Sequence, residues 1–362
     1  MPLRVCRSSW RDQSDGISGS GSGISEQIVD GFLQSADESV GLPSLRNGPV
    51  VQLRRRQSGH DRLRAESRCQ VLVEVTVSGV NYLDVAQRSG GTPLTAPFAA
   101  GVEGVGRVVQ TGDDVSGFSV GQRVGWLTGG QGSFSDLVAV DASKLVAIPD
   151  EVEDAAAVAA LMQGITAHYL TMDTHRVGAG DVVLVHAAAG GVGQMLTQMA
   201  KLKGATVIGT TSTEEKARIA RDNGADHIVG YDGAGQGVHD LTGGEGASVV
   251  YDGVGAATFD ESLRALRIRG TLAVIGAASG PVPSLDVNAL NTGGSLYLTR
   301  PTVVHHVRTP EELAKRAADV FGWIASGDLR VSIGGTYPIS DVAAAFSALE
   351  ARETTGKIVL TH

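Results

Sequence analysis

Short runs of apolar residues in the second half of the chain alternate with helical or glycine-rich segments. Uninterrupted apolar runs are typical of strands buried on both faces of a parallel sheet, and helical periodicity follows the first two runs at residues 194–202 and 214–223. The pattern predicts an α/β protein with a doubly wound parallel sheet of six strands. The predicted strands are Val182–Val185, Ala205–Gly209, His227–Val229, Ser248–Tyr251, Leu272–Ile275 and Ser295–Thr299.

A different pattern precedes these runs. Every second residue from Val71 to Val77 is a valine, which predicts a strand, and residues 101–109 and 120–126 resemble strands and turns of a glycine-rich β domain. The C-terminal part contains two predicted helices, at 314–326 and 341–352, and a last strand at 357–361. We expect a β-rich domain, then the parallel-sheet domain, with the active site in the cleft between them.

The turn after the first predicted strand of the parallel sheet has the spacing of a dinucleotide-binding motif. Residues Ala188–Gly193 follow G-x-G-x-x-G with Ala in the first position. Gly190 allows the backbone to approach a pyrophosphate, and Gly193 allows the next helix to pack tightly on the strand. The helix N-terminus, with Gly191 and Val192, would direct its amides at the phosphates. The alternative is an ordinary tight turn, but the second strand and helix that follow at once favour dinucleotide binding.

The end of the second strand favours NADPH over NADH. Residues 210–212 are Thr, Thr and Ser, where a site without a 2′-phosphate usually carries Asp or Glu. Hydroxyl groups bond a phosphate without repelling it, and Lys216 lies one helical turn beyond Ser212. The alternative is that Lys216 pairs with the two preceding glutamates on a solvated helix face. We assign Arg218 and Arg221 to such a solvated face.

Two further glycine-containing turns follow predicted strands. They are Asp252–Gly255 and Gly276–Gly280. Ligands of doubly wound sheets bind outside the carboxyl ends of the strands, where these turns are expected to lie. Both turns are therefore candidate cofactor contacts.

Composition and charge exclude several classes of partner. A net charge of −9 over 362 residues argues against nucleic acid, which needs a basic surface. No apolar run approaches the roughly 18 residues of a membrane span. Cys6 and Cys69 are too few to staple a protein of this size, which indicates a reducing compartment, the cytoplasm.

Residues 1–70 form an atypical segment. They contain the low-complexity stretch SGSGSG at 18–23, the arginine run 54–56 and little apolar periodicity, so we expect a poorly ordered segment. It looks like the product of a shifted reading frame or start in the gene, and the alternative is a true extension.

Several motifs after Val71 occur in the order typical of one family. GVNYLDVAQRSG, PFAAGVEGVGRVVQTGDDVSGFSVGQRV, QGITAHYL, HAAAGGVGQM and SLYLTRP resemble the zinc-free quinone oxidoreductases, the ζ-crystallin-like branch of the medium-chain dehydrogenases/reductases. The resemblance implies a GroES-like catalytic domain and a Rossmann domain that binds NADPH. It also implies a homodimer. The corresponding limits are 71–164 for the first part of the catalytic domain, 165–301 for the Rossmann domain and 302–362 for the C-terminal return to the catalytic domain.

The resemblance also bears on zinc. Zinc-dependent relatives carry Cys at the position of Asn81 and His at the position of Val102, and the four cysteines of a structural zinc lobe have no counterpart beyond residue 69. The adjacent His305 and His306 do not face one centre on a helix or strand, so we assign them to the surface or to a loop. We therefore expect no metal.

Residues at the family's cofactor positions carry over one by one. By resemblance Asn81 and Tyr169 lie by the nicotinamide and phosphates and position the nicotinamide or the substrate, although Tyr169 is alternatively a core aromatic and Arg352 a solvated helix-end cation. The remaining expected dinucleotide contacts are Gly190, Gly191, Val192, Gly193, Ser212, Lys216, Tyr231, Gly276, Ala277, Ser279, Thr299, Arg300 and Arg352.

Without a metal, the expected reaction is hydride transfer to an electrophile that delocalises charge onto its own oxygen. Quinones and alkenes conjugated to a carbonyl both qualify. Bacterial relatives often carry tyrosines where this chain has Ala86 and Thr92, and their loss would remove aromatic stacking on a flat quinone. Quinone reduction is the leading hypothesis, reduction of enone or alkenal double bonds is the second, and a non-catalytic NADPH-binding protein is the third.

Overall fold

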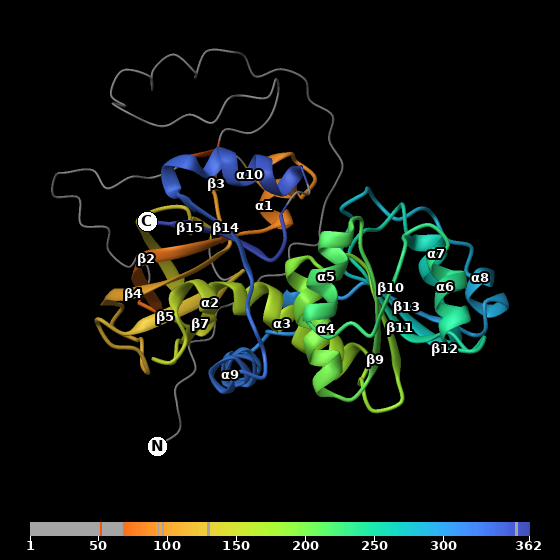
Figure 1. The fold of residues 1–362 in the computed structure, drawn as a ribbon. Helices are drawn as coiled ribbons and strands as arrows, with labels where there is room; N and C mark the ends of the chain where they lie inside the picture. Colours follow the sequence, from red (N-terminus) through yellow and green to blue (C-terminus); the bar gives the residue numbers. More distant parts are fainter. Residues whose placement is uncertain (1–50, 53–67, 93, 96–97, 129–130, 352–353) are drawn as a thin grey trace, which may run out of the picture.

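The computed structural model describes residues 51–52, 68–92, 94–95, 98–128, 131–351 and 354–362. Most of the segment that we expect to be poorly ordered, and Arg352, lie outside these ranges. Figure 1 shows a β-rich part with β2, β4 and β5 and a second part built around a parallel sheet, with the helices α2 and α3 running between them.

The parallel sheet confirms the doubly wound prediction. Its six strands pair in the order β10-β9-β8-β11-β12-β13, and every pair is parallel. In chain order this is 3-2-1-4-5-6, the arrangement of dinucleotide-binding folds. The strands are β8 (Val182–Val185), β9 (Thr206–Thr210), β10 (His227–Val229), β11 (Ala247–Asp252), β12 (Leu266–Val274) and β13 (Tyr297–Thr299).

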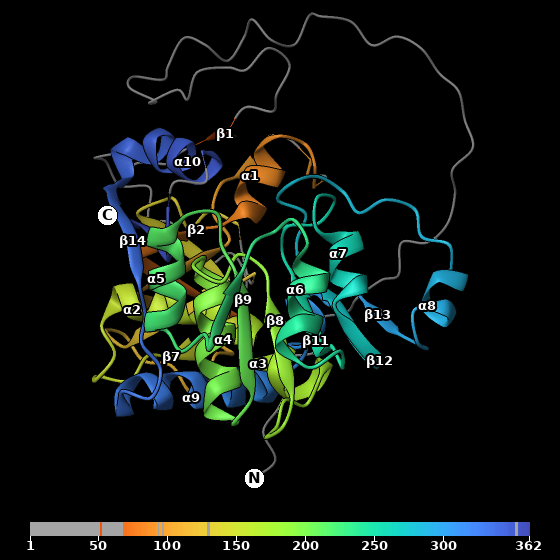
Figure 2. The same ribbon diagram turned by 45° about the vertical axis from the view of Figure 1, so that its right-hand side comes forward.

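Helices cover both faces of this sheet (Figures 1 and 2). Val183 and Val185 pack into the cluster that contains Met195 of α4, whereas Leu184, which points the other way, packs with Phe259 of α7. Burial on both faces explains why the strands read as apolar runs without alternation. The helices are α4 (Gly191–Leu202), α5 (Glu214–Asp222), α6 (Ala234–Leu241), α7 (Phe259–Arg264) and α8 (Asn288–Thr292).

The β-rich part is built on a seven-stranded sheet. Its strand order is β14-β15-β2-β4-β5-β7, and β6 also pairs with β2. The last strand of the chain, β15, runs antiparallel to β2, with Ile358 opposite Val80 and Leu360 opposite Ser78. The last strand of the chain thus shares a sheet with β2, which lies about 280 residues earlier. The strands are β2 (Gln70–Val80), β4 (Glu103–Thr111), β5 (Arg123–Leu127), β6 (Leu137–Asp141), β7 (Leu145–Ala147), β14 (Ile333–Pro338) and β15 (Lys357–Thr361).

The remaining short elements surround this sheet. β1 (Val51–Gln52) pairs in parallel with β3 (Phe98–Ala99), and α1 (Tyr82–Arg88) follows β2 directly. Short helical turns are η1 (Ala142–Lys144), η4 (Val303–His305) and η5 (Ile339–Asp341), and α10 (Val342–Glu350) packs on β14 and β15.

We keep the domain limits drawn from the sequence as a proposal.

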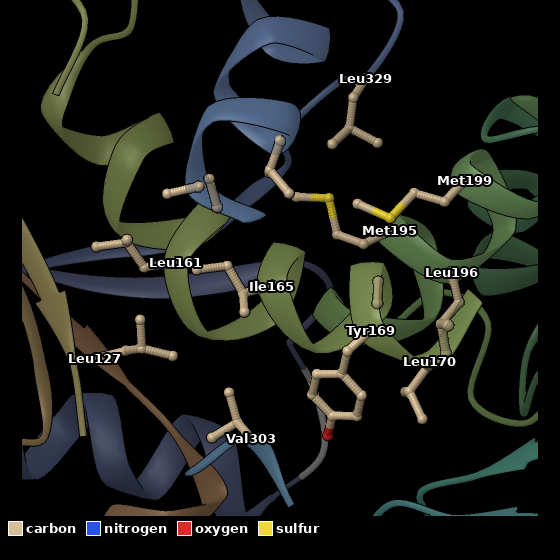
Figure 3. Close-up of a cluster of buried hydrophobic side chains, with 14 of the residues drawn as sticks. Leu127, Leu161, Ile165, Tyr169, Leu170, Met195, Leu196, Met199, Val303 and Leu329 are labelled. Atoms are coloured by element: carbon tan, nitrogen blue, oxygen red, sulfur yellow. The ribbon is translucent and has the colours of Figure 1, made fainter. Parts of the chain in front are cut away.

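One continuous helical segment joins the two sheets. It comprises α2 (Asp154–Ala159), η2 (Ala160–Gly164), α3 (Ile165–Tyr169) and η3 (Leu170–Thr174), and both η2 and η3 are π-helical. Leu161 and Ile165 are fully buried, and Figure 3 shows them on this segment beside the methionines of α4. The main core therefore lies between the two sheets, so the π-helical turns occupy the boundary at which a site is expected.

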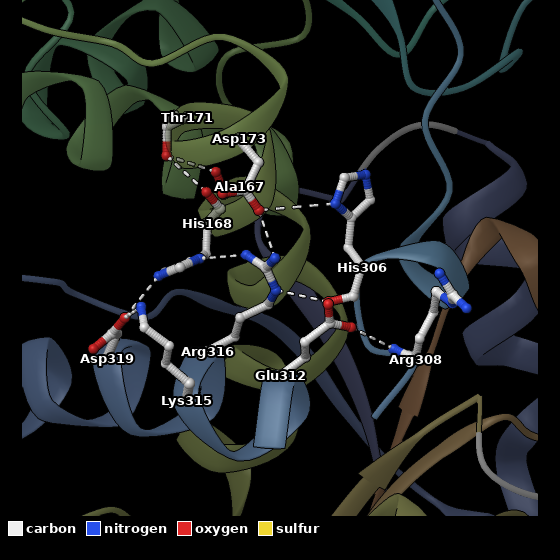
Figure 4. Close-up of polar contacts among 10 residues, drawn as sticks. All are labelled: Ala167, His168, Thr171, Asp173, His306, Arg308, Glu312, Lys315, Arg316 and Asp319. Carbon is white, nitrogen blue, oxygen red and sulfur yellow. Dashed lines mark hydrogen bonds and ion pairs between the residues drawn. The ribbon is translucent and has the colours of Figure 1, made fainter. Parts of the chain in front are cut away.

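The helix α9 (Pro310–Ser326) packs against this helical segment and is hydrogen-bonded to it (Figure 4). Arg316 donates to the backbone oxygen of His306 at 2.7 Å and to Asp173 at 2.5 Å, and its Nη1 lies 3.2 Å from Nδ1 of His168. The other ring nitrogen of His168 lies 3.1 Å from Asp319. Burial lowers the pKa of His168, so the ring is neutral near pH 7 and accepts from Arg316.

Element boundaries differ from the sequence prediction in small ways. The helix α4 begins at Gly191 rather than Gln194, because Gly190 is its N-cap. The helix α9 begins at Pro310 rather than at 314, because Thr309 caps it by accepting a hydrogen bond from the amide of Glu312. The strand β12 begins at Leu266, six residues earlier than predicted, in a stretch with exposed Ile268 and Arg269 that does not have the pattern of a buried strand.

Candidate functional site

The glycine-rich turn connects β8 to the N-terminus of α4. Gly190 is extended, and its oxygen accepts the hydrogen bond from Gln194 at 2.9 Å. The amides of Gly191, Val192 and Gly193 precede this bond, and amides of the first helical turn have no acceptor within the helix. The turn therefore presents three donors and the positive end of the helix dipole, which is the environment that a phosphate requires.

Two glycines of this turn lie in close contact with their surroundings. A Cβ atom on Gly193 would lie 2.3 Å from the backbone oxygen of Ala187, so the close approach of helix and strand requires glycine there. A Cβ atom on Gly191 would lie 2.1 Å from Nε2 of Gln163, a residue of the π-helical turn η2. The turn is thus packed against the segment that joins the two sheets.

The predicted 2′-phosphate residues follow β9. Ser212 is exposed, and Thr213 caps α5 by accepting a hydrogen bond from the amide of Lys216 at 3.2 Å. Lys216 is half-buried in the first turn of α5. Arg218 and Arg221 pair with Asp222 and Glu214, as expected for surface charges, at 3.3 and 2.6 Å.

A buried hydrogen-bond network behind the glycine-rich turn was missed by sequence reasoning. Asp252, at the end of β11, accepts from the hydroxyl of Ser262 at 2.7 Å, and this hydroxyl lies 3.0 Å from Nε2 of His186. Nδ1 of His186 lies 3.0 Å from the hydroxyl of Thr210 at the end of β9. Burial lowers the pKa of His186, so a neutral ring that donates from Nε2 completes the chain. The network fixes the ends of three strands relative to each other. Its signal in the sequence was a polar residue, His186, Thr210 or Asp252, directly after three of the six apolar runs.

The two other glycine-containing turns are bonded together. Ser279 donates to the backbone oxygen of Val254 at 2.7 Å and accepts from the amide of Ala257 at 2.9 Å. A Cβ atom on Gly276 would lie 2.6 Å from the oxygen of Gly253, so the backbones are in direct contact. The structure therefore places Gly276, Ala277 and Ser279 at the carboxyl edge of the sheet, near Asp252. Thr299 is half-buried and Arg300 is exposed at the end of β13 on the same edge.

Asn81 lies in a second polar cluster, in the β-rich part. Its Oδ1 accepts from Nζ of Lys357 at 2.7 Å, and its Nδ2 donates to Oε2 of Glu103 at 3.0 Å. Lys357 and Glu103 form an ion pair of 2.5 Å with no exposed side-chain surface. The backbone amide of Asn81 donates to Asp84 at 2.8 Å, which caps α1. The half-buried Asn81 is thus held by the three buried side chains of Lys357, Glu103 and Asp84.

Two contacts bring this cluster to the glycine-rich turn. The amide of Met162 in η2 donates to Oε1 of Glu103 at 2.5 Å, and the next residue, Gln163, packs on Gly191. Gly356, which precedes Lys357, forms an isolated parallel bridge with Gly190. The structure therefore brings Asn81 and the predicted phosphate cradle to opposite sides of one junction.

The two predicted tyrosine contacts lie in different surroundings. Tyr169 is 2% exposed, and its ring stacks on His306 at 4.1 Å between centroids. Burial raises the pKa of Tyr169 to about 12. This packing is that of a core aromatic, and a nicotinamide contact for Tyr169 stays a prediction. Tyr231 is half-buried and faces the ring of His186 at 6.1 Å.

The part of the chain that the structure describes contains no candidate metal site. Among these residues, no group of three or more His, Cys, Asp or Glu side chains is arranged to hold an ion. Val102, at the position of a zinc ligand in zinc-dependent relatives, is 2% exposed. No helix within the described ranges is long and apolar enough to cross a membrane.

Comparisons with known proteins agree with this geometry. Residues 67–150 match the model of the alcohol dehydrogenase GroES-like domain, and residues 191–321 match that of zinc-binding dehydrogenases. A quinone oxidoreductase of Pseudomonas aeruginosa is 40% identical over 294 residues, which cover 80% of this chain and 90% of the relative. A 2-haloacrylate reductase of a Burkholderia species is 39% identical with the same coverage. A mycobacterial protein solved in complex with NADPH superposes with a TM-score of 0.80 at 43% identity, covering 84% of this chain and 94% of that one.

The buried carboxyl group of Asp84 generates a prediction on pH dependence. Burial raises the pKa of Asp84 to about 7, and the hydrogen bonds with Asn81 and the charge of Lys357 oppose this rise in part. The folded state therefore holds a proton that the unfolded state releases near pH 4, and the contribution of Asp84 to the free energy of unfolding falls as pH rises from about 4 to about 7.

We expect Asp84→Asn to remove this dependence. Relative to wild type, the free energy of unfolding of the variant should rise between pH 4 and pH 8, by an amount on the order of 1–4 kcal/mol. Denaturant unfolding at several pH values measures it, with the exposed Asp113→Asn as the control. Parallel pH curves for wild type and Asp84→Asn would contradict a raised pKa.

Proposed function

Because this chain belongs to the quinone oxidoreductase family of the medium-chain dehydrogenases/reductases, we propose that it transfers hydride from NADPH to quinones or to alkenes conjugated to a carbonyl. The observation that carries the proposal is the junction at which the glycine-rich turn meets the Asn81 cluster, through the bridge between Gly190 and Gly356. One side offers a phosphate cradle, and the other offers an oriented amide for the reacting end of the cofactor.

The residues present fit NADPH. The amides of Gly191, Val192 and Gly193 would hold the pyrophosphate, because they form the first turn of α4. Ser212 and Lys216 would hold the 2′-phosphate beside β9. Asn81 lies on the nicotinamide side, together with the loop of Gly276, Ala277 and Ser279. Tyr231, Thr299 and Arg300 complete the proposed contacts, and Tyr169 and Arg352 remain proposals from the family resemblance.

The bound cofactor supplies hydride, and the protein supplies position. A quinone or enone takes the negative charge onto its own oxygen, so the chain needs to align the acceptor and to exclude competing water. The side-chain amide of Asn81 and the backbone amides of the glycine-rich turn are neutral donors at the junction, which suits an acceptor that needs no strong acid.

Turnover with a panel of acceptors tests this function. Purified protein with NADPH should reduce quinones, enones or both, measured by the loss of cofactor absorbance at matched concentrations. A 2-haloacrylate reductase among the relatives supports including halogenated acrylates. Tight NADPH binding with no turnover on any acceptor would contradict the proposed reaction and favour a non-catalytic binding protein.

The second candidate, reduction of enones or alkenals, is favoured by Ala86. This residue is half-buried on α1, and its backbone oxygen accepts from Thr92 at 3.0 Å, so the two positions expected to carry aromatic rings carry small side chains side by side. A higher kcat/KM for enones than for quinones would select this candidate.

Cofactor choice generates a prediction at Lys216. Lys216→Ala should weaken NADPH binding by about 1.5–3 kcal/mol and leave NADH binding nearly unchanged, because a charge-assisted bond to the 2′-phosphate is lost. Fluorescence titration of both cofactors measures the effect. Arg221→Ala is the matched control, since Arg221 pairs with Glu214. Equal losses for both cofactors would place Lys216 outside the phosphate site.

We also propose a homodimer that forms over the edge strand β13. Tyr297 and Leu298 of β13 are 60 and 38% exposed, and Ile268 of the neighbouring β12 is 73% exposed. These side chains lie next to a cavity of about 1410 Å³ between β12 and α8. Apolar side chains on an unpaired strand edge favour association. The family resemblance supports a homodimer, and we keep the cytoplasmic location expected from the sequence as a proposal.

Analytical ultracentrifugation tests the dimer. Wild type should sediment as two 37.3 kDa chains, and Leu298→Lys should shift the population to monomer, because a charge on the edge opposes association. Val120→Lys, at a 70% exposed position of the β-rich part, should leave the dimer intact. A monomeric wild type would refute this assembly, and a fully dimeric Leu298→Lys would move the interface elsewhere.

A further inference from the structure

The ion pair between Lys357 and Glu103 is buried, although packing of the core alone would not require two charged side chains there. Both side chains have no exposed surface, and an apolar pair of similar volume would often serve the core as well or better, because two charges lose their hydration. What an apolar pair cannot supply is direction. Two buried charges of opposite sign can orient a polar group that lies between them.

Their shared neighbour is the side-chain amide of Asn81. The ammonium of Lys357 faces Oδ1 at 2.7 Å, and Oε2 of Glu103 faces Nδ2 at 3.0 Å. A flipped amide would place its NH₂ group against the ammonium and its oxygen against the carboxylate, and both contacts would be repulsive. The pair thus selects one of the two amide orientations.

The same pair is connected to the phosphate cradle. Glu103 accepts from the amide of Met162 in η2, next to the Gln163 that packs on Gly191. Lys357 follows Gly356, which bridges to Gly190. The frame that orients the amide of Asn81 is therefore continuous with the backbone that would hold the pyrophosphate.

We propose that Lys357 and Glu103 are a positioning pair that fixes the side-chain amide of Asn81 in one orientation relative to the glycine-rich turn, so that the reacting ring of the cofactor meets it in a defined geometry. The proposal rests on the proposed function, because Asn81 is a cofactor contact by family resemblance. Lys357 and Glu103 act through Asn81 and do not touch the reactants.

The experiment combines the double variant Glu103→Gln/Lys357→Met with Asn81→Ala. The double variant leaves no unpaired buried charge, and the glutamine keeps an acceptor for Met162. We expect the double variant and Asn81→Ala each to lower kcat by about 10- to 100-fold, as small misplacements of a reacting group do. Adding Asn81→Ala to the double variant should lower kcat by less than about 2-fold, because the function of Asn81 is already lost.

A second readout requires neither cofactor nor turnover. The Nδ2 protons of Asn81, assigned by NMR through loss of their signals in Asn81→Ala, should form a widely separated, slowly exchanging pair in wild type. In the double variant they should move toward the values of a solvated asparagine, while the melting temperature and the backbone signals of the glycine-rich turn stay close to wild type.

Each outcome decides a different point. Multiplicative losses in kcat, or unchanged Asn81 signals in a folded double variant, would overturn the positioning pair. A wild type without turnover on any acceptor would refute the proposed function, and the amide signals would still decide whether the pair orients Asn81.

Discussion

The carboxylate of Glu103 is the point on which the arrangement of the site depends. One oxygen accepts from the amide of Met162, and the other accepts from Lys357 and Asn81. These partners come from the helical segment between the sheets, from the last strand and from the loop after β2. A single buried group thus joins three distant parts of the chain, and loss of its charge would leave the ammonium of Lys357 buried and unpaired.

The dinucleotide side of the junction is rigid for a different reason. Gly193 allows a backbone contact with Ala187 that a side chain would prevent, and Gly191 lies against the side chain of Gln163. The network from Asp252 through Ser262 and His186 holds the strand ends behind them. Hydrogen bonds to the buried carboxylate of Asp252 and to the ring of His186 maintain this half, whereas the ion pair of Lys357 and Glu103 maintains the other. Because Gln163 and Gly356 touch the glycine-rich turn from the charged half, the cradle and Asn81 are held in one frame.

Much of this fold could be predicted from local patterns. The six apolar runs and the glycine spacing predicted the parallel sheet and its first turn, because strands buried on both faces and a close helix approach leave unambiguous signals. The predicted ends of helices were less accurate where an N-cap residue determines them, as at Gly190 and Thr309. The Asn81 cluster could not be predicted from the sequence, because Lys357 lies 276 residues from Asn81 and 254 residues from Glu103. No local periodicity of the sequence connects such distant residues. For Tyr169 the family resemblance implied a cofactor contact and a core aromatic was the alternative; the structure packs its ring on His306, and the cofactor contact stays a prediction.

A crystal structure of the complex with NADPH tests the central claim most directly, namely that the two halves of the junction serve one cofactor. The account predicts the pyrophosphate on the amides of Gly191, Val192 and Gly193. It also predicts the nicotinamide beside Asn81, with the amide of Asn81 still bonded to Lys357 and Glu103. A dinucleotide bound away from the glycine-rich turn, or a nicotinamide out of contact with Asn81, would contradict it.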